Sequence, residues 1–417
     1  MLLLSGCLKL TNFPDITGRM ACLLEVHAEA TALRLPDDLG EMECLEELYC
    51  DNTVIQEPPP SISLLKKLKI LTFRGCKPLA SRSQYSFFLP RLLPGTTCQD
   101  TKASPSLSLS GLSSLIQLDL SDCSMLDGGF PSDLGELPCL QVLNLSNNKF
   151  VGIPAESLAR LTRLKKLDLV ACSKLETLPE LPSSIQQLYI DECTDLKGNI
   201  DMFAKYPKLS RISFTKCLQL LQDQRYSHMV DGIWQLLLKG LSKADRNFSI
   251  LFPGISIPEC FTYKNLGRSI AADLPRNWYN DKFLGFAICV PDFRGFKGLW
   301  LHDYVSEKYA VCVVFGYRTH DGGGYCALRP IGVGTIQNVV SERSCLAYLS
   351  YRCLSSTSRD YQNPNEWSQI VVYGSSEKER TAVYGLQLVY EDDVKQAQAQ
   401  ADEQLMIQSN YSILSSD

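Results

Sequence analysis

Cysteine is the residue type with the widest possible chemistry in this chain, because a thiol can bind a metal, form a disulfide or attack a substrate. The sequence holds 17 cysteines but only four histidines, and no two cysteines have the Cys-x-x-Cys spacing of common metal sites. Five of them fall at repeat-like intervals: Cys76, Cys123, Cys172, Cys193 and Cys217. The spacing therefore predicts structural thiols inside a repeat, and we expect no metal site.

Two histidines have carboxylates beside them, an arrangement that can support proton transfer. His302 precedes Asp303 and lies near Glu307, and His320 precedes Asp321. Both pairs lie in turn-rich sequence without an accompanying nucleophile, so we interpret them as solvated surface. The glycine run 322–324 lacks the strand and helix that flank a phosphate-binding loop, and is typical of a hairpin tip. We expect no catalytic residues and no cofactor.

Length and charge restrict the partners. The chain has 417 residues and a net charge of -5, which gives no general attraction to nucleic acid or anionic lipid. No apolar run is long enough to span a membrane. Leu4-Ser5-Gly6-Cys7 imitates a lipoprotein cleavage site, but only three leucines precede the serine, too few for a secretory core. We expect a protein of the cytoplasm and also of the nucleus, whose Asn-x-Ser sequences at Asn144, Asn247 and Asn410 carry no glycans.

A motif of the form LxxLxLxx(C/N/T) accounts for the cysteine spacing. It is clear in Leu115–Cys123, Leu140–Asn148, Leu164–Cys172, Ile185–Cys193 and Leu209–Cys217, and also in Leu68–Cys76, Leu45–Thr53 and a worn copy at Leu23–Thr31. The chain opens on the tail of a further copy, ending at Cys7. A period of ~24 residues is that of the leucine-rich repeat. We predict an α/β solenoid of about nine repeats over residues 1–225, with parallel strands on its concave face.

Two segments interrupt or close the repeats. Residues 80–110 are rich in serine, threonine and proline, and are predicted to be an irregular insertion, either a protruding loop or an unstructured bulge. Residues 226–247 place Ile233, Trp234, Leu237, Leu238 and Leu241 on one helical face. We expect a helix there that caps the solenoid and links it to the next domain.

Residues 248–392 have a different pattern. Short β-branched and aromatic runs occur at 283–290, 309–315, 345–349, 369–373 and 385–390, separated by turn-forming residues. Several short strands without a helical period predict an all-β sandwich. The remaining residues, 393–417, are predicted to form a flexible tail, either as a loose helix or as unstructured chain.

Within this domain, Ser249–Phe261 and Leu274–Ala287 resemble the post-repeat domain of plant intracellular immune receptors. In the repeat region, Leu178–Leu188 is similar to the late repeats of the same receptors. That family is the TIR-NB-LRR disease-resistance proteins, and the domain is their C-terminal jelly-roll/Ig-like domain (C-JID). The sequence has no GxxxxGK[ST] phosphate loop. The resemblance therefore implies only the sensor half of such a receptor, without the nucleotide-binding switch or the TIR domain that cleaves NAD in relatives.

The resemblance implies that the repeats and the sandwich together hold a pathogen effector protein. Nine strands about 4.8 Å apart would give a ridge of roughly 40 Å, enough for the ~800 Å² that a specific interface needs from each partner. The candidate contact residues are outward positions of the repeats and one loop of the sandwich: Tyr49, Asp51, Asp119, Asn144, Lys166, Asp168, Tyr189, Asp191, Ser213, Trp278 and Tyr279. Trp278 suits core packing as well as partner contact.

We expect a non-catalytic sensor whose partners are an effector and the TIR and nucleotide-binding domains of a complete receptor, with no nucleic acid or membrane. Two alternatives stay open. Leu143–Pro154 also resembles the repeat of extracellular plant receptors, which favours an exported recognition module. Alternatively, a complete gene product carries NAD hydrolase activity in a TIR domain outside this sequence.

Overall fold

The computed structural model describes residues 1–76, 109–221 and 248–290 except for a few positions within each range. It also describes residues 232, 234 and 238 and the segments 296–303, 308–313, 343–350, 369–374 and 382–399. The chain divides into two compact units. The first contains Met1–Gly198 and Lys216–Leu220, and the second contains Asn199–Thr215 and Leu221–Asp417. Of the predicted insertion at 80–110, residues 80–108 lie outside the described part of the chain.

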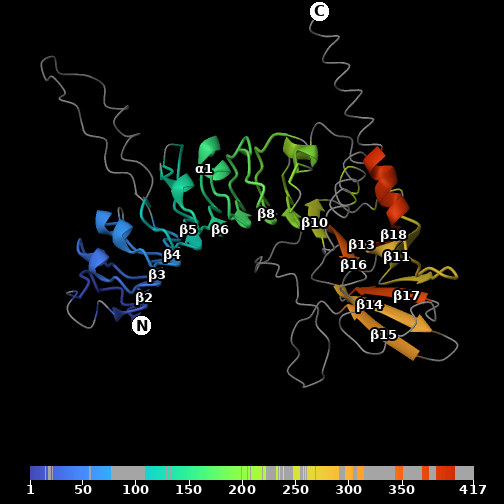
Figure 1. Cartoon of the computed structure of the whole chain (residues 1–417), viewed down its shortest axis with the longest axis horizontal. Coiled ribbons are helices and arrows are strands. Elements are labelled where there is room, and N and C mark those ends of the chain that lie inside the picture. The colour runs from blue at the N-terminus through green and yellow to red at the C-terminus, as the bar shows by residue number, and fades with distance from the viewer. Residues whose placement is uncertain are drawn as a thin grey trace, which may run out of the picture. The chain divides into compact units, whose positions relative to one another are not determined.

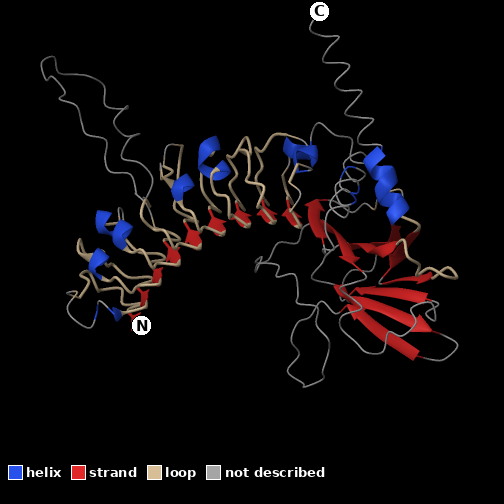
Figure 2. Ribbon diagram, viewed as in Figure 1, coloured by secondary structure: helices blue, strands red, loops and turns tan. Residues whose placement is uncertain are grey.

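The first unit is a solenoid with one short parallel strand per repeat (Figures 1 and 2). Its strands are β1 (Leu2–Leu3), β2 (Glu25–His27), β3 (Glu47–Tyr49), β4 (Ile70–Thr72), β5 (Gln117–Asp119), β6 (Val142–Asn144), β7 (Lys166–Asp168) and β8 (Gln187–Tyr189). From β2 to β8 the middle residue is fully buried, as Leu118 and Leu167 illustrate. The leucine-rich-repeat solenoid and its strand register are thereby confirmed.

Each repeat turns away from its strand at a residue in the left-handed backbone conformation. Positive φ values occur at Ala30, Asn52, Gly75, Asp122, Asn147, Ala171, Glu192 and Lys216, directly before the residue that closes each motif. This conformation ends the strand after three residues and directs the following side chain inward. The sequence motif thus fixes both the strand and the bend that follows it.

The closing side chains join neighbouring repeats. The thiols of Cys76, Cys123, Cys172, Cys193 and Cys217 lie 2.9–3.2 Å from backbone carbonyl oxygens of the preceding repeat, to which they donate hydrogen bonds. Asn148 donates to Leu120 O at 2.9 Å and to Leu145 O at 2.8 Å. Burial raises the pKa of Cys172 to about 12, so its thiol stays protonated. The structural role predicted for these cysteines is confirmed.

Short helices form the side of the first unit opposite its strands (Figure 2). They are η2 (Leu39–Glu41), η3 (Pro60–Leu64), η5 (Leu134–Glu136) and α1 (Ala155–Ala159). Leu39, Ile62, Leu134 and Leu158 point from these helices into the core, where each is at most 1% exposed. One leucine or isoleucine per helix is enough to close each repeat, because stacking shares the core between neighbours.

The second unit contains two β-sheets. The first sheet has the order β9-β10-β16-β13-β18-β11 and the second the order β12-β17-β14-β15. Their strands are β9 (Arg211–Ser213), β10 (Phe248–Pro253), β11 (Tyr263–Gly267), β12 (Ser269–Asp273), β13 (Phe283–Val290), β14 (Phe296–Asp303), β15 (Lys308–Val313), β16 (Arg343–Ser350), β17 (Gln369–Gly374) and β18 (Ala382–Tyr390). Apart from the parallel β9–β10 pair, the strand pairs are antiparallel, as in a β-sandwich.

The last repeat strand belongs to the second unit. β10 pairs in parallel with β9, with Ile250 opposite Ile212, and its other edge pairs with β16. The sandwich sheet therefore continues from a repeat strand instead of beginning after a separate linker. Helical backbone is described at residues 232, 234 and 238 of the predicted linker, where Trp234 packs against Phe261 with 5.1 Å between ring centroids.

Two expectations for this unit need correction. His302 and Asp303, placed in a turn from the sequence, end strand β14, where His302 pairs with Tyr309 and Gln369. Residues 391–399 form a helix, one of the two forms predicted from 393 onward, but its Val394 and Ala397 are buried, so this part is packed and is not a flexible tail. Three successive acidic residues, 391–393, favour this helix start through its dipole, and Asp393 accepts a hydrogen bond from the Tyr390 backbone N–H at 2.7 Å.

Candidate protein-binding surface

The exposed face of the repeat strands carries regular rows of side chains. The first and third residues of each strand from β2 to β8 flank the buried middle residue, and nearly all are half-buried. The register aligns the third residues into one row: His27, Tyr49, Thr72, Asp119, Asn144, Asp168 and Tyr189. This row contains five of the predicted contact positions, which therefore lie side by side on the exposed strand face.

The centre of the row is a fixed polar network. Asn144 Nδ2 donates to Asp119 Oδ2 at 2.8 Å, across neighbouring strands. Asp119 Oδ1 accepts a hydrogen bond from the Ser121 backbone N–H at 2.9 Å, and Asn144 Oδ1 accepts one from the Ser146 backbone N–H at 3.0 Å. Side chains held this way lose little further entropy when a partner docks.

The next two strands place a cation beside an aromatic ring. Lys166 Nζ lies 5.2 Å from the centroid of the Tyr189 ring and 3.9 Å from Asp168 Oδ2. The Tyr189 hydroxyl donates to Gln187 at 3.2 Å. Burial raises the pKa of Asp168, although Lys166 and the Val170 N–H act in the opposite direction. The three predicted residues of this group therefore form one connected cluster.

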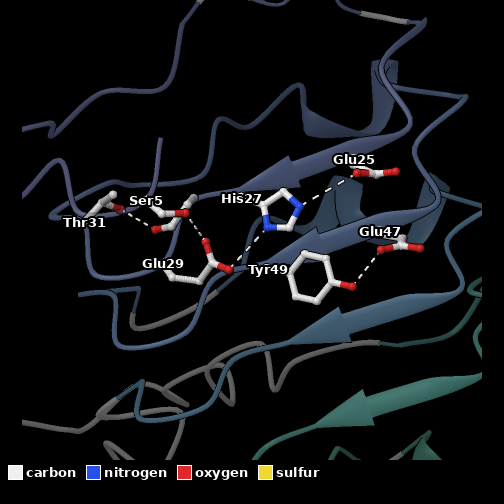
Figure 3. A network of polar contacts seen from close by, with 8 residues as sticks. Ser5, Glu25, His27, Glu29, Thr31, Glu47 and Tyr49 are labelled. Atoms are coloured by element: carbon white, nitrogen blue, oxygen red, sulfur yellow. Dashed lines mark hydrogen bonds and ion pairs between the residues drawn. The ribbon is translucent and has the colours of Figure 1, made fainter. Parts of the chain in front are cut away.

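At the N-terminal end, an imidazole and a phenol ring stack. The centroids of His27 and Tyr49 are 4.6 Å apart with an interplanar angle of 13°. His27 Nδ1 lies 3.3 Å from Glu29 Oε1, and the Tyr49 hydroxyl donates to Glu47 Oε2 at 2.6 Å (Figure 3). Burial, together with Glu47 and then the charges of Glu25 and Glu29, raises the pKa of Tyr49 to about 12.

Glu29 and Asp51 extend this end of the surface one row further. Burial alone would raise the pKa of Glu29, but hydrogen bonds from Ser5, the backbone and His27 bring it below its usual value. Asp51 accepts a hydrogen bond from the Arg74 N–H at 3.0 Å, and burial raises its pKa. Glu25, His27 and Glu29 were not among the predicted contact residues, although the register of the degenerate motif Leu23–Thr31 places all three at outward positions.

Three predicted contact residues are not surface groups. Asp191 is 4% exposed, Ser213 2% and Trp278 2%. The indole of Trp278 packs against Phe283 and Phe286 at 5.0 and 5.6 Å between ring centroids, and its backbone carbonyl accepts the Tyr390 hydroxyl. Trp278 is therefore a core residue of the sandwich. Tyr279 beside it is half-buried and keeps an accessible side.

Other kinds of site find no support in the described part of the chain. Within it, no group of three histidine, cysteine, aspartate or glutamate side chains is arranged to hold a metal ion. None of the helices described there has the length and apolar character needed to cross a bilayer. The side chains on the exposed strand face are hydrogen-bonding and aromatic groups, the combination typical of protein interfaces.

Comparison with known families defines the class. The C-JID domain family matches residues 252–395, and the family of leucine-rich repeats in two copies matches residues 138–183. The chain is thus a leucine-rich-repeat protein with a C-JID domain, the arrangement found at the C-terminal region of plant TIR-NB-LRR resistance proteins.

Two plant resistance proteins agree with this class. The chain is 31% identical over 290 residues to TMV resistance protein N of Nicotiana glutinosa, covering 68% of this chain and 22% of the relative. It is 27% identical over 374 residues to disease resistance protein RPS4B of Arabidopsis thaliana, covering 81% of this chain and 30% of the relative. The chain spans less than a third of the length of these two relatives. Among solved structures, the leucine-rich repeat domain of the type III effector XopL is 22% identical, with a TM-score of 0.39, 51% of this chain and 67% of that chain covered.

Proposed function

We propose that this chain is the ligand-sensing part of a plant immune receptor and binds a pathogen effector protein. The observation that carries the proposal is the aligned row of fixed polar and aromatic side chains from His27 to Tyr189. Similarity to plant resistance proteins supports the biological setting. The free thiols at the described cysteines suit a reducing compartment, which supports action inside the cell.

The surface has the dimensions of a protein interface. Seven adjacent strands, β2 to β8, at about 4.8 Å spacing give a row of roughly 30 Å. With side chains three rows deep, such a face can supply the ~800 Å² that a specific complex buries on one partner. Tyr189 and Tyr49 are the proposed anchors, because aromatic residues contribute most often to interface energy.

Binding is the chain's proposed mode of action. An effector that binds the active state more tightly than the resting state would shift the receptor toward signalling. The TIR and nucleotide-binding domains of a complete receptor would carry the signal. NAD turnover by the purified chain is expected to stay at background, and measurable turnover would contradict this non-catalytic assignment.

Co-immunoprecipitation with secreted proteins of a pathogen, expressed one at a time in leaf tissue, tests the proposal. The wild-type chain should retain at least one of them. Asn144→Arg should abolish that binding by breaking the bond to Asp119 and adding bulk at the centre of the row. Glu156→Arg is the matched control, because Glu156 lies on α1 with its side chain 83% exposed. Equal binding by both variants would contradict the proposed surface.

A further inference from the structure

The end of the surface formed by β2 and β3 combines an aromatic pair with four carboxylates. The register places Glu25 opposite Glu47 and His27 opposite Tyr49. Glu29 and Asp51 follow two residues after the aromatic pair, on the same face. We call these six residues the acidic–aromatic patch: Glu25, His27, Glu29, Glu47, Tyr49 and Asp51. Figure 3 shows the carboxylates of Glu25, Glu29 and Glu47 around the two rings.

In the part of the chain that the structure describes, no lysine or arginine side chain forms an ion pair with the glutamates of this patch. Among the described residues, the ion pairs of Glu25 and Glu29 are made only with His27, at 3.9 and 3.3 Å. Glu47 accepts a hydrogen bond from the neutral Tyr49 hydroxyl. Elsewhere in the same unit, carboxylates form ion pairs with lysines. Glu46 Oε2 lies 2.6 Å from Lys69 Nζ, and Glu192 Oε1 lies 2.7 Å from Lys216 Nζ. The patch therefore carries an excess of negative charge that a cationic partner can complete.

The patch is accessible and held in shape. The side chain of Glu25 is 40% exposed, Glu29 29% and His27 25%. Stacking fixes the two rings, and the hydroxyl of Tyr49 is fixed by Glu47. The raised pKa of Tyr49, caused by burial and then by Glu47, Glu25 and Glu29, is consistent with their negative potential acting at the ring.

We propose that the acidic–aromatic patch binds an arginine-bearing segment of the protein partner. A guanidinium group is planar, pairs with carboxylates through two parallel N–H groups and stacks on aromatic rings. The carboxylates of the patch can accept the paired N–H groups, and its aromatic rings can stack against the planar group. A lysine ammonium satisfies only the charge, so the patch should prefer arginine. The proposal rests on the proposed function and adds the chemistry of the ligand to it.

Fluorescence anisotropy with short synthetic peptides tests the preference. The purified full chain is titrated with a labelled peptide in which arginines alternate with glycine and serine, and with its lysine and glutamate counterparts. The arginine peptide should bind most tightly, the lysine peptide several-fold more weakly and the glutamate peptide not at all. Binding should weaken as salt is raised. A glutamate peptide that binds as well as the arginine peptide would overturn the proposal.

Paired variants show where the peptide binds. The double variant Glu25→Gln/Glu47→Gln should weaken arginine-peptide binding by about tenfold, because two rim charges are lost while shape is kept. The matched control, Glu176→Gln/Glu192→Gln, removes two carboxylates that pair with Lys197 and Lys216 and should change binding by less than about twofold. Circular dichroism checks that both variants are folded. If both double variants weakened peptide binding equally, the assignment of peptide binding to the acidic–aromatic patch would be refuted. Loss of the peptide preference while an effector still binds would refute this inference alone and leave the proposed function intact.

Discussion

The thiol of Cys193 donates a hydrogen bond of 3.2 Å to the backbone carbonyl of Leu169, one repeat earlier in the chain. The carbonyl would be left without this donor in Cys193→Ala, which should lower the free energy of unfolding by about 1–3 kcal/mol. Cys193→Asn should lose less, because Asn148 at the same motif position donates to the equivalent carbonyl of Leu120. Urea unfolding of both variants measures the difference. An alanine variant as stable as the wild type would show that the bond contributes nothing.

The strand register can be tested at two neighbouring positions. Leu167 is fully buried, whereas Asp168 is half-buried on the exposed strand face. Leu167→Asp should destabilise the solenoid by several kcal/mol, roughly 3–5, because a carboxylate would replace a core side chain. Asp168→Ala should cost less than about 1 kcal/mol. Thermal melting compares the two, and the reverse order would mean that the register is shifted by one residue.

Two glycines with positive φ allow the stability cost of a strained backbone conformation to be distinguished from the cost of a steric collision. Gly111 has φ +98° and Gly6 φ +76°. A Cβ added at Gly111 would collide with the backbone carbonyl oxygen of Ser63, whereas one added at Gly6 would meet nothing within 4 Å. Gly111→Ala should therefore cost roughly 3 kcal/mol and Gly6→Ala only about 1 kcal/mol. Equal losses in chemical denaturation would show that the collision is relieved without cost.

Alkaline pH should weaken the repeats. Burial raises the pKa values of Cys123, Cys172 and Cys217 from 9.0 to about 12. Above pH 9 these thiols ionise in the unfolded chain but stay protonated in the folded one, so their stabilisation is complete below pH 9 and is lost as pH rises toward 12. The loss should be about 1 kcal/mol per thiol at pH 10. Denaturation with reductant at pH 7.5, 9 and 10 measures it, and Cys172→Ala should show a shallower pH dependence.

The repeat unit was predictable because its information is local. Each copy of LxxLxLxx(C/N/T) predicts which residues face the core. Leu118, Leu143 and Leu167 are buried, as the alternation of apolar and outward residues in the motif requires. The acidic–aromatic patch was not predicted, because the first of its two repeats departs from the consensus motif. Val26 and Ala28 stand where most copies have larger apolar residues, which hid the outward positions between and beside them.

The second unit was only partly predictable because its pairings are non-local. The runs that became β13, β15, β16, β17 and β18 are strongly apolar, whereas β11, β12 and β14 contain polar residues and were not predicted. The β9–β10 pairing joins Ser249 to Arg211, and no local pattern signals such a contact. Trp278 could be assigned to the core only after Phe283 and Phe286 were seen to contact it.

Site-specific photo-cross-linking tests the central claim, that the chain recognises a pathogen protein through the exposed strand face. A benzophenone amino acid replaces either Tyr189 in the row or Glu156 on the outer helix α1, and the chain is irradiated in infected leaf tissue. We expect the variant at Tyr189 to cross-link a pathogen-encoded protein and the variant at Glu156 to yield none. Cross-linking of the same protein from Glu156 but not from Tyr189 would contradict the account.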